Sequence, residues 1–212
     1  MSVSLFYTSF FLGLLVPVLW FVLRKKIDSR TFGMVPFILL VGFASLYETL
    51  VTRILWVDSK IWFRVYGLLE FACIYYYFKT LVQGYRKFYY FLWFIYLLLF
   101  AYFNVQWNAM GHLKADSYLI TVEVVLVFSS SIFWFQQLFR SKEVTSLYQL
   151  ADFYFVSGFI LYFAGTYVLD LMGDYLINNV RSEFLVYWNL MIVFNIVLRL
   201  ILLVGIWKKS EK

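Results

Sequence analysis

The chain has 212 residues, of which 64% are hydrophobic, 24% are aromatic and only 14% are charged. A typical soluble domain is about half apolar and about a quarter charged, so this composition excludes an ordinary water-soluble fold. The formal net charge is +6, but the basic residues flank apolar runs, which indicates membrane orientation and not a nucleic-acid partner. We therefore expect one integral membrane domain over residues 1–212, with the lipid bilayer as its solvent.

Seven apolar segments are each long enough to cross about 30 Å of hydrocarbon as a helix. They run over residues 4–23, 32–52, 61–81, 88–104, 118–138, 153–172 and 184–206, and the fourth is short. The runs are apolar on all sides, whereas the strands of a membrane barrel alternate every second residue. The sequence therefore predicts an all-α protein with seven transmembrane helices and short connections.

The first two segments carry the only prolines of the chain, Pro17 and Pro36. Each proline removes a backbone donor and favours a kink inside a helix. The first segment has no basic residue before Arg24 and no small-residue cleavage site after it. We expect it to be a retained helix and not a signal peptide.

Lysine and arginine residues are distributed unequally between the two sides of the predicted bundle. One side holds twelve, Arg24, Lys25, Lys26, Arg30, Lys79, Arg86, Lys87, Arg140, Lys142, Lys208, Lys209 and Lys212, and the other holds five, Arg53, Lys60, Arg64, Lys114 and Arg181. The richer side is expected to be cytoplasmic, which puts the N-terminus outside and the C-terminus inside. This predicts a multi-pass membrane protein.

Four tryptophans fall near predicted segment ends, Trp56 and Trp62 on the outer side and Trp134 and Trp207 on the inner side. This position is typical of the aromatic belts that lie at the headgroups. We expect these rings to anchor the bundle at the membrane surfaces.

Two pairs of segments resemble each other within the chain. "GFASLYET" from Gly42 matches "GFILYFAGT" from Gly158, and "VYGLLEFACI" from Val65 matches "VYWNLMIVFNI" from Val186. The two separations are nearly equal, which is consistent with a 3+1+3 internal repeat that has the fourth helix as its connector. Chance similarity among common membrane residues is the alternative.

Several polar residues fall inside the predicted spans, where a charge costs about 2.5–3.5 kcal/mol and usually faces the bundle interior. Those in the outer parts of different helices predict an outward-facing polar pocket, with Glu70 deeper. The candidate ligand-binding residues are Glu48, Arg64, Tyr66, Glu70, Glu123, Asp170 and Asn189. The structural alternative places Glu48 and Asp170 at the headgroups and pairs Glu123 with Arg64 to hold helices together.

Glu70 lies near the middle of the run "RVYGLLEFACIYYYF", so its carboxyl group needs either a partner or a proton. Arg199 lies deeper on the seventh segment, and two environments are open to it. It pairs diagonally with Glu70 if the two helices touch, or it extends to the cytoplasmic headgroups along its aliphatic stem.

Motifs for catalysis and for metal binding are missing from the sequence. There is one cysteine, Cys73, and one histidine, His112, with no H-E-x-x-H, CxxC or P-loop pattern. The serines Ser129–Ser131 lack a nearby base and are expected to pack helices together. We therefore expect no enzyme activity, no cofactor and no metal.

Three stretches carry a family resemblance: "YGLLEFACIYYYF", "TVEVVLVFSSSIFWFQQLF" and "FYFVSGFILYFAGTYVL". With Glu70 and Glu123 they resemble a bacterial seven-helix membrane region that occurs alone or ahead of sensor histidine kinases. The resemblance implies a sensor-like role in a bacterial inner membrane. The chain ends at "WKKSEK" without an output domain, so signalling is expected to pass to a separate partner protein.

Three functions remain open from the sequence. The first is a sensor or accessory receptor with an outward-facing polar pocket and a cytoplasmic partner. The second is a small-solute or proton-coupled transporter or channel, which the repeat and the depth of Glu70 favour. The third is a structural subunit of a membrane complex that packs through its aromatic faces.

Overall fold

A computed structural model describes residues 3–24, 33–55, 60–110, 112–141, 146–179 and 184–210. Throughout these residues the regular elements are helical, as predicted. They are α1 (Val3–Leu23), α2 (Val35–Tyr47), the π-helix η3 (Glu48–Ile54), α3 (Lys60–Leu81), α4 (Arg86–Met110), α5 (His112–Ser141), the 3₁₀ turn η4 (Leu147–Gln149), α6 (Ala151–Asn179) and α7 (Phe184–Ser210).

Five of the described helices, α1, α4, α5, α6 and α7, are long and apolar enough to cross a membrane, and the apolar helix over Val35–Val51 is shorter. The chain is therefore a membrane protein by the character of its helices. α3 is long enough as well, but it includes Arg64, Glu70 and Lys79. The predicted short fourth segment is part of a helix of 25 residues. Seven membrane crossings and their orientation stay predictions.

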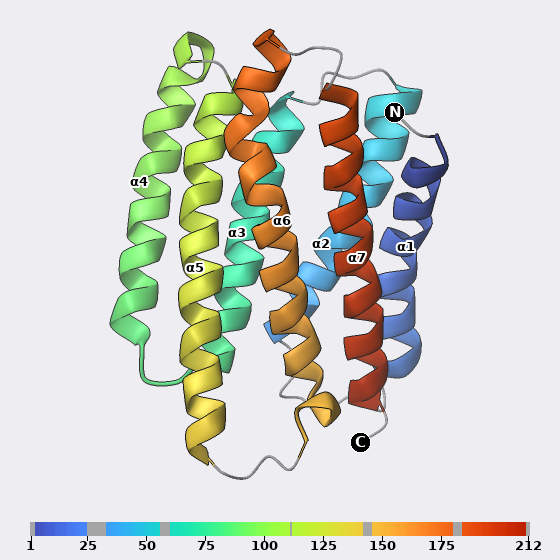
Figure 1. The fold of residues 1–212 in the computed structure, drawn as a ribbon, viewed down its shortest axis with the longest axis vertical. Helices are drawn as coiled ribbons and strands as arrows, with labels where there is room; N and C mark the ends of the chain where they lie inside the picture. The colour runs from blue at the N-terminus through green and yellow to red at the C-terminus, as the bar shows by residue number, and fades with distance from the viewer. Residues whose placement is uncertain are drawn as a thin grey trace.

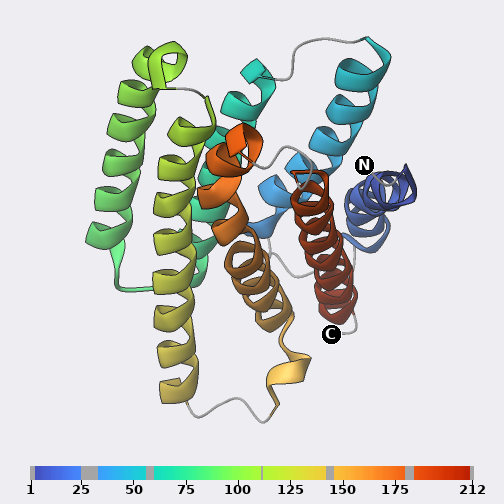
Figure 2. The ribbon, with the colours of Figure 1, turned by 45° about the horizontal axis from the view of Figure 1, so that its top comes forward.

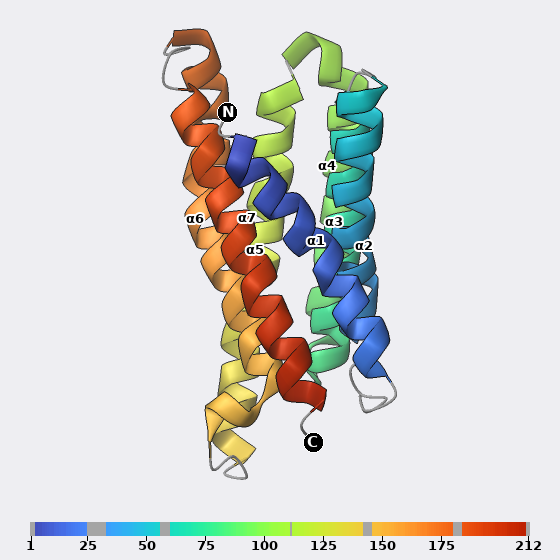
Figure 3. The same ribbon diagram turned by 90° about the vertical axis from the view of Figure 1, so that its right-hand side faces the viewer.

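The helices form one bundle in which successive helices run in alternating directions, and the two termini lie at opposite ends (Figure 1). α6 packs between α5 and α7, and α3 packs against α2, α4 and α5. Figure 2 shows α4 at one edge of the bundle and α1 at the other. α1 crosses obliquely between α7 and α2 (Figure 3), and it packs on both. The 3+1+3 repeat stays a prediction.

Close contact between α1 and α2 depends on a proline and a glycine. A Cβ at Gly42 would press against the ring of Pro17, so the glycine lets the two helices approach. Pro36 lies in the first turn of α2 and not in its interior. Its missing N–H has no partner within the helix at that position, so it starts the helix without the kink that the sequence predicted.

Large rings fill the bundle where α2 and α6 begin and α3 ends. The ring of Phe159 lies 4.9 Å from that of Phe37, 5.9 Å from that of Tyr77 and 6.0 Å from that of Phe78, measured between centroids. All four side chains are buried, and so is Phe155 beside Tyr77. We refer to Phe37, Tyr77, Phe78, Phe155 and Phe159 as the aromatic layer. The residues lie toward the starts of α2 and α6 and the end of α3, and these helix ends are at the end of the bundle that contains the C-terminus (Figure 1).

α4 is attached to the bundle by tyrosine hydroxyls. Tyr89 donates a hydrogen bond to Ser130 on α5 (3.0 Å), and Tyr96 donates to the carbonyl oxygen of Gly67 on α3 (3.1 Å). The Tyr96 ring also stacks on Phe71, with centroids 3.6 Å apart. Ser130 thus joins two helices, which is the packing role predicted for the serine run.

Two of the four tryptophans that were predicted to lie at the headgroups do not lie there. Trp62 and Trp134 are buried inside the bundle, and Trp62 stacks on Tyr47 with ring centroids 4.0 Å apart. Trp207 is exposed, as a belt residue would be. Trp56 lies outside the described residues. Ring size explains the difference, because an indole near a helix end can fill the gap between two helices as well as reach the headgroups.

Candidate functional site

Six polar side chains from four elements come together inside the bundle. We call them the polar cluster: Glu48 from η3, Tyr66 and Glu70 from α3, Tyr162 and Asp170 from α6, and Arg199 from α7. The charges of Asp170 and Glu48 both act on Glu70, and the charge of Glu48 acts on Arg199. The structure thus brings together four of the seven predicted site residues: Glu48, Tyr66, Glu70 and Asp170.

Glu70 lies on α3 and is the most buried of the three carboxyl groups in the cluster. Its side chain is only 8% exposed, and the hydroxyl of Tyr66 donates to its Oε1 atom over 3.3 Å. The two residues are one helical turn apart, which places them on the same face of α3. The partner that the sequence demanded for Glu70 is therefore supplied from its own helix.

Arg199 is buried and does not reach the headgroups. Its side chain is 6% exposed, and its Nη1 atom donates to the carbonyl oxygen of Ser9 and, over 2.7 Å, to the Ser9 hydroxyl. Of the two environments that the sequence left open, the extension to the cytoplasmic headgroups is therefore wrong. The diagonal partner also differs from the prediction, since the carboxylate whose charge acts on Arg199 is Glu48.

Small residues on α1 create the space for the guanidinium group. A Cβ at Gly13 would meet the hydroxyl oxygen of Ser45 on α2 and the Nη1 atom of Arg199. Gly13 follows Ser9 by one turn, and Pro17 follows Gly13 by another, so all three lie on one face of α1. This spacing of small residues is the sequence signal that would have located the neighbour of Arg199.

One buried donor of the cluster makes no hydrogen bond to the described part of the chain. The Nε atom of Arg199 lacks a hydrogen-bond partner among the residues that the structure describes. Buried polar groups are nearly always hydrogen-bonded, and those that are not usually mark the position of a water or a ligand. The cluster therefore has an unused donor beside an excess of carboxyl groups.

The α2 helix changes form where it meets the cluster. It continues from Tyr47 into the π-helix that begins at Glu48. A π-helix is rare and often occurs at functional sites, because the wider turn redirects the side chains that follow it. The side chain of Glu48 is half-buried at this transition.

Two of the predicted site residues have partners on α4 instead. The Tyr96 hydroxyl lies 3.3 Å from the Oε1 atom of Glu123, so its one proton is shared between Glu123 and the Gly67 carbonyl oxygen, and Arg64 donates to Asn104 over 3.4 Å. Sequence reasoning missed both Tyr96 and Asn104, because it assigned no polar function to the fourth helix. Glu123 is only 3% exposed, and its charge acts on Tyr162, which connects this contact to the polar cluster.

The remaining predicted residue, Asn189, is half-buried near the start of α7. On the preceding helix, α6, the Tyr167 hydroxyl lies 3.5 Å from that of Thr121 on α5. Trp188 on α7 is 36% exposed.

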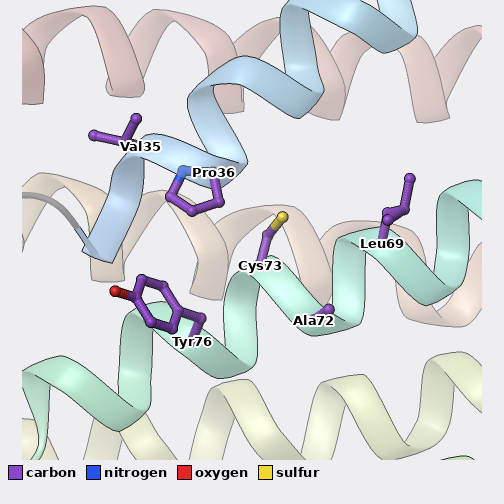
Figure 4. Close-up of a pocket in the computed structure, with 6 residues that line it drawn as sticks. All are labelled: Val35, Pro36, Leu69, Ala72, Cys73 and Tyr76. Carbon is purple, nitrogen blue, oxygen red and sulfur yellow. The ribbon is translucent and has the colours of Figure 1, made fainter.

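The surface has an apolar hollow between α2 and α3 (Figure 4). Its lining residues are Val35, Pro36, Leu69, Ala72, Cys73 and Tyr76. Because Leu69 and Tyr76 are exposed, the hollow opens on the outer surface of the bundle. None of the seven predicted site residues lines it.

Within the described residues, no group of three or more histidine, cysteine, aspartate or glutamate side chains is arranged to hold a metal ion. The polar cluster instead combines hydroxyl groups, carboxyl groups and one guanidinium group, a set suited to binding a small polar ligand. No family model, curated protein or solved structure matches the chain. The resemblance to the kinase-associated membrane region stays a prediction.

Proposed function

We propose that the protein is a sensor or accessory receptor of a bacterial inner membrane, and that the polar cluster binds its ligand from the N-terminal side. Three carboxyl groups, Glu48, Glu70 and Asp170, accompany one guanidinium group, Arg199. This excess of carboxyl groups favours a small cationic ligand or one that donates hydrogen bonds. Tyr66 and Tyr162 would supply ring faces beside the carboxyl groups, which suits an ammonium group.

The observation that carries the proposal is the position of the aromatic layer. Its rings pack against one another between the start of α2, the end of α3 and the start of α6, and we infer that they close the bundle on the side of the C-terminus. Leu198, Leu202 and Ile206 of α7 are also buried in this half. A site above such a layer can exchange ligand with one side of the membrane only, as a receptor requires.

α7 offers a route from the ligand to the partner. It carries Arg199 in the cluster and extends as one helix to Lys208 and Lys209 in its last turn. A ligand that changes the balance of charge around Arg199 would shift α7 against α1, because the guanidinium group links the two helices. A helix shift of this kind is a common way to pass a signal through a packed bundle.

The transporter alternative requires a polar path from the cluster to both ends of the bundle. The aromatic layer argues against that path. The third alternative, a structural subunit, does not explain why three carboxyl groups gather around Arg199, or why its Nε donor is not used by any described residue.

Thermal unfolding of the purified protein with a panel of small amines, zwitterions and inorganic cations tests the proposal. A ligand should raise the unfolding temperature of the wild type and have a much smaller effect on Asp170→Asn. Liposome flux of the same compounds is the second measurement. Flux that Glu70→Gln abolishes would overturn the receptor in favour of a transporter.

A further inference from the structure

We propose that the turn between α3 and α4 binds the phosphate headgroup of an anionic phospholipid. A hollow of about 620 Å³ opens there, lined by Lys79, Thr80, Val82, Gln83, Gly84 and Arg86. Two cations and a side-chain amide therefore surround one space, whereas the Thr80 hydroxyl donates to the carbonyl oxygen of Tyr77 over 2.8 Å. The cations and the amide are the donor set that a phosphate group requires.

The hollow is held in shape by its neighbours. The backbone N–H of Gln83 donates to the Oε1 atom of Gln137 over 3.3 Å, and the Nε2 atom of Gln137 donates to the carbonyl oxygen of Gln83 over 2.6 Å. This reciprocal pair fastens the turn to α5. The ring of Tyr85 stacks on Phe133 with centroids 4.1 Å apart, which fixes the other side of the turn.

Gly84 makes this tight connection feasible. Its φ angle is +89°, a conformation that other residues adopt only at a cost. The chain can therefore reverse direction between Leu81 and Arg86 in a short turn. A binding site that already has its shape loses little conformational entropy when a ligand enters.

The charged residues of the chain segment around the turn are all positive. Lys79, Arg86 and Lys87 lie within nine residues, and the sequence has no aspartate or glutamate between Glu70 and Asp116. The ammonium group of Lys79 lies over the rings of Tyr75 and Tyr90, at 5.4 and 4.5 Å from their centroids. These contacts keep the ammonium group at the wall of the hollow.

The depth of the turn fits a lipid and not only a dissolved anion. It joins the ends of two long helices at one end of the bundle, which is the level of the headgroups in a membrane. Next to it, Tyr90 and Phe91 on α4 are exposed toward the surroundings of the bundle, where acyl chains would lie. Basic pockets at helix ends are a known form of lipid headgroup site.

Native mass spectrometry of the purified full-length chain tests the assignment with phosphatidylglycerol, phosphatidylcholine and soluble glycerol 3-phosphate as probes. We expect phosphatidylglycerol to bind more tightly than phosphatidylcholine. Lys79→Gln and Arg86→Gln should each weaken that binding about fivefold, whereas Lys79→Arg should retain it. The matched control is Lys208→Gln with Lys209→Gln, which removes two charges at the same end of the bundle.

Each remaining outcome overturns the proposal. Equal affinity for the two lipids would remove the charge recognition. An equal loss in the α7 control pair would assign the effect to general surface charge. Glycerol 3-phosphate that binds as tightly as the lipid would assign the hollow to a soluble phosphate.

Discussion

Arg199 on α7 donates hydrogen bonds to both the carbonyl and the hydroxyl oxygen of Ser9 on α1. This contact joins the last helix of the chain to the first, beside the charge of Glu48. A buried guanidinium group is expensive unless its hydrogen bonds are made and an anion is near. The pair therefore links the packing of the bundle to the charge balance of the polar cluster.

Arg199→Met should lower the free energy of unfolding in lipid bicelles by about 1–3 kcal/mol, because the buried Ser9 carbonyl oxygen and hydroxyl lose a charged donor. Ser9→Ala removes only the hydroxyl acceptor and should cost about 0.6 kcal/mol, the average for a side-chain hydrogen bond between membrane helices. Leu200→Met, on the exposed face of α7, is the control and should have little effect. Similar values for all three variants would contradict the structural role of Arg199.

Gly13→Ala should destabilise the protein by about 1–3 kcal/mol, because the new methyl group overpacks the contact between α1, Ser45 and Arg199. The matched control is Gly67→Ala, since a Cβ at Gly67 meets nothing within 4 Å. Adding Ser45→Ala to Gly13→Ala removes one of the clashing atoms and should restore part of the loss. Equal effects at Gly13 and Gly67 in thermal unfolding would argue against the close approach.

Tyr96→Phe should weaken the attachment of α4 while keeping the ring stacked on Phe71. The expected loss is about 0.6–1.7 kcal/mol, the range for hydrogen bonds between membrane helices. Tyr102→Phe is the control, because that side chain is 54% exposed on α4. Proteolysis of the native protein should cut near α4 faster in Tyr96→Phe alone; an unchanged rate would contradict this role of the hydroxyl.

Much of the fold follows from the sequence because apolar length is a local property. The runs at 153–172 and 184–206 lie inside α6 and α7, and the all-helical class needs only the rule that a chain in lipid must satisfy its own backbone. The end of α2 was less predictable. A π-helix from Glu48 depends on which turns pack on the neighbouring helices, and composition does not encode that.

The polar cluster was predictable in part for the same reason. Glu48, Glu70 and Asp170 stand out as charges in apolar runs, and the cost of burying them predicts that they meet. The environment of Arg199 could not be predicted, because a long basic side chain can either reach the headgroups or turn inward. Which of these occurs is decided by Ser9 and Gly13 on another helix. The partner of Glu123, Tyr96 on α4, could not be predicted either, because the sequence does not distinguish it from the many other tyrosines.

Access to the polar cluster from each side of the membrane tests the central claim most directly. Single cysteines placed in a Cys73→Ala background, at Tyr66, Asp170, Phe155 and Phe159, would be treated with a membrane-impermeant thiol reagent from either side. We predict that Tyr66→Cys and Asp170→Cys react only from the side of the N-terminus. Phe155→Cys and Phe159→Cys, in the aromatic layer, should react from neither side. Reaction of the cluster cysteines from the side of the C-terminus would contradict a closed layer and a one-sided site.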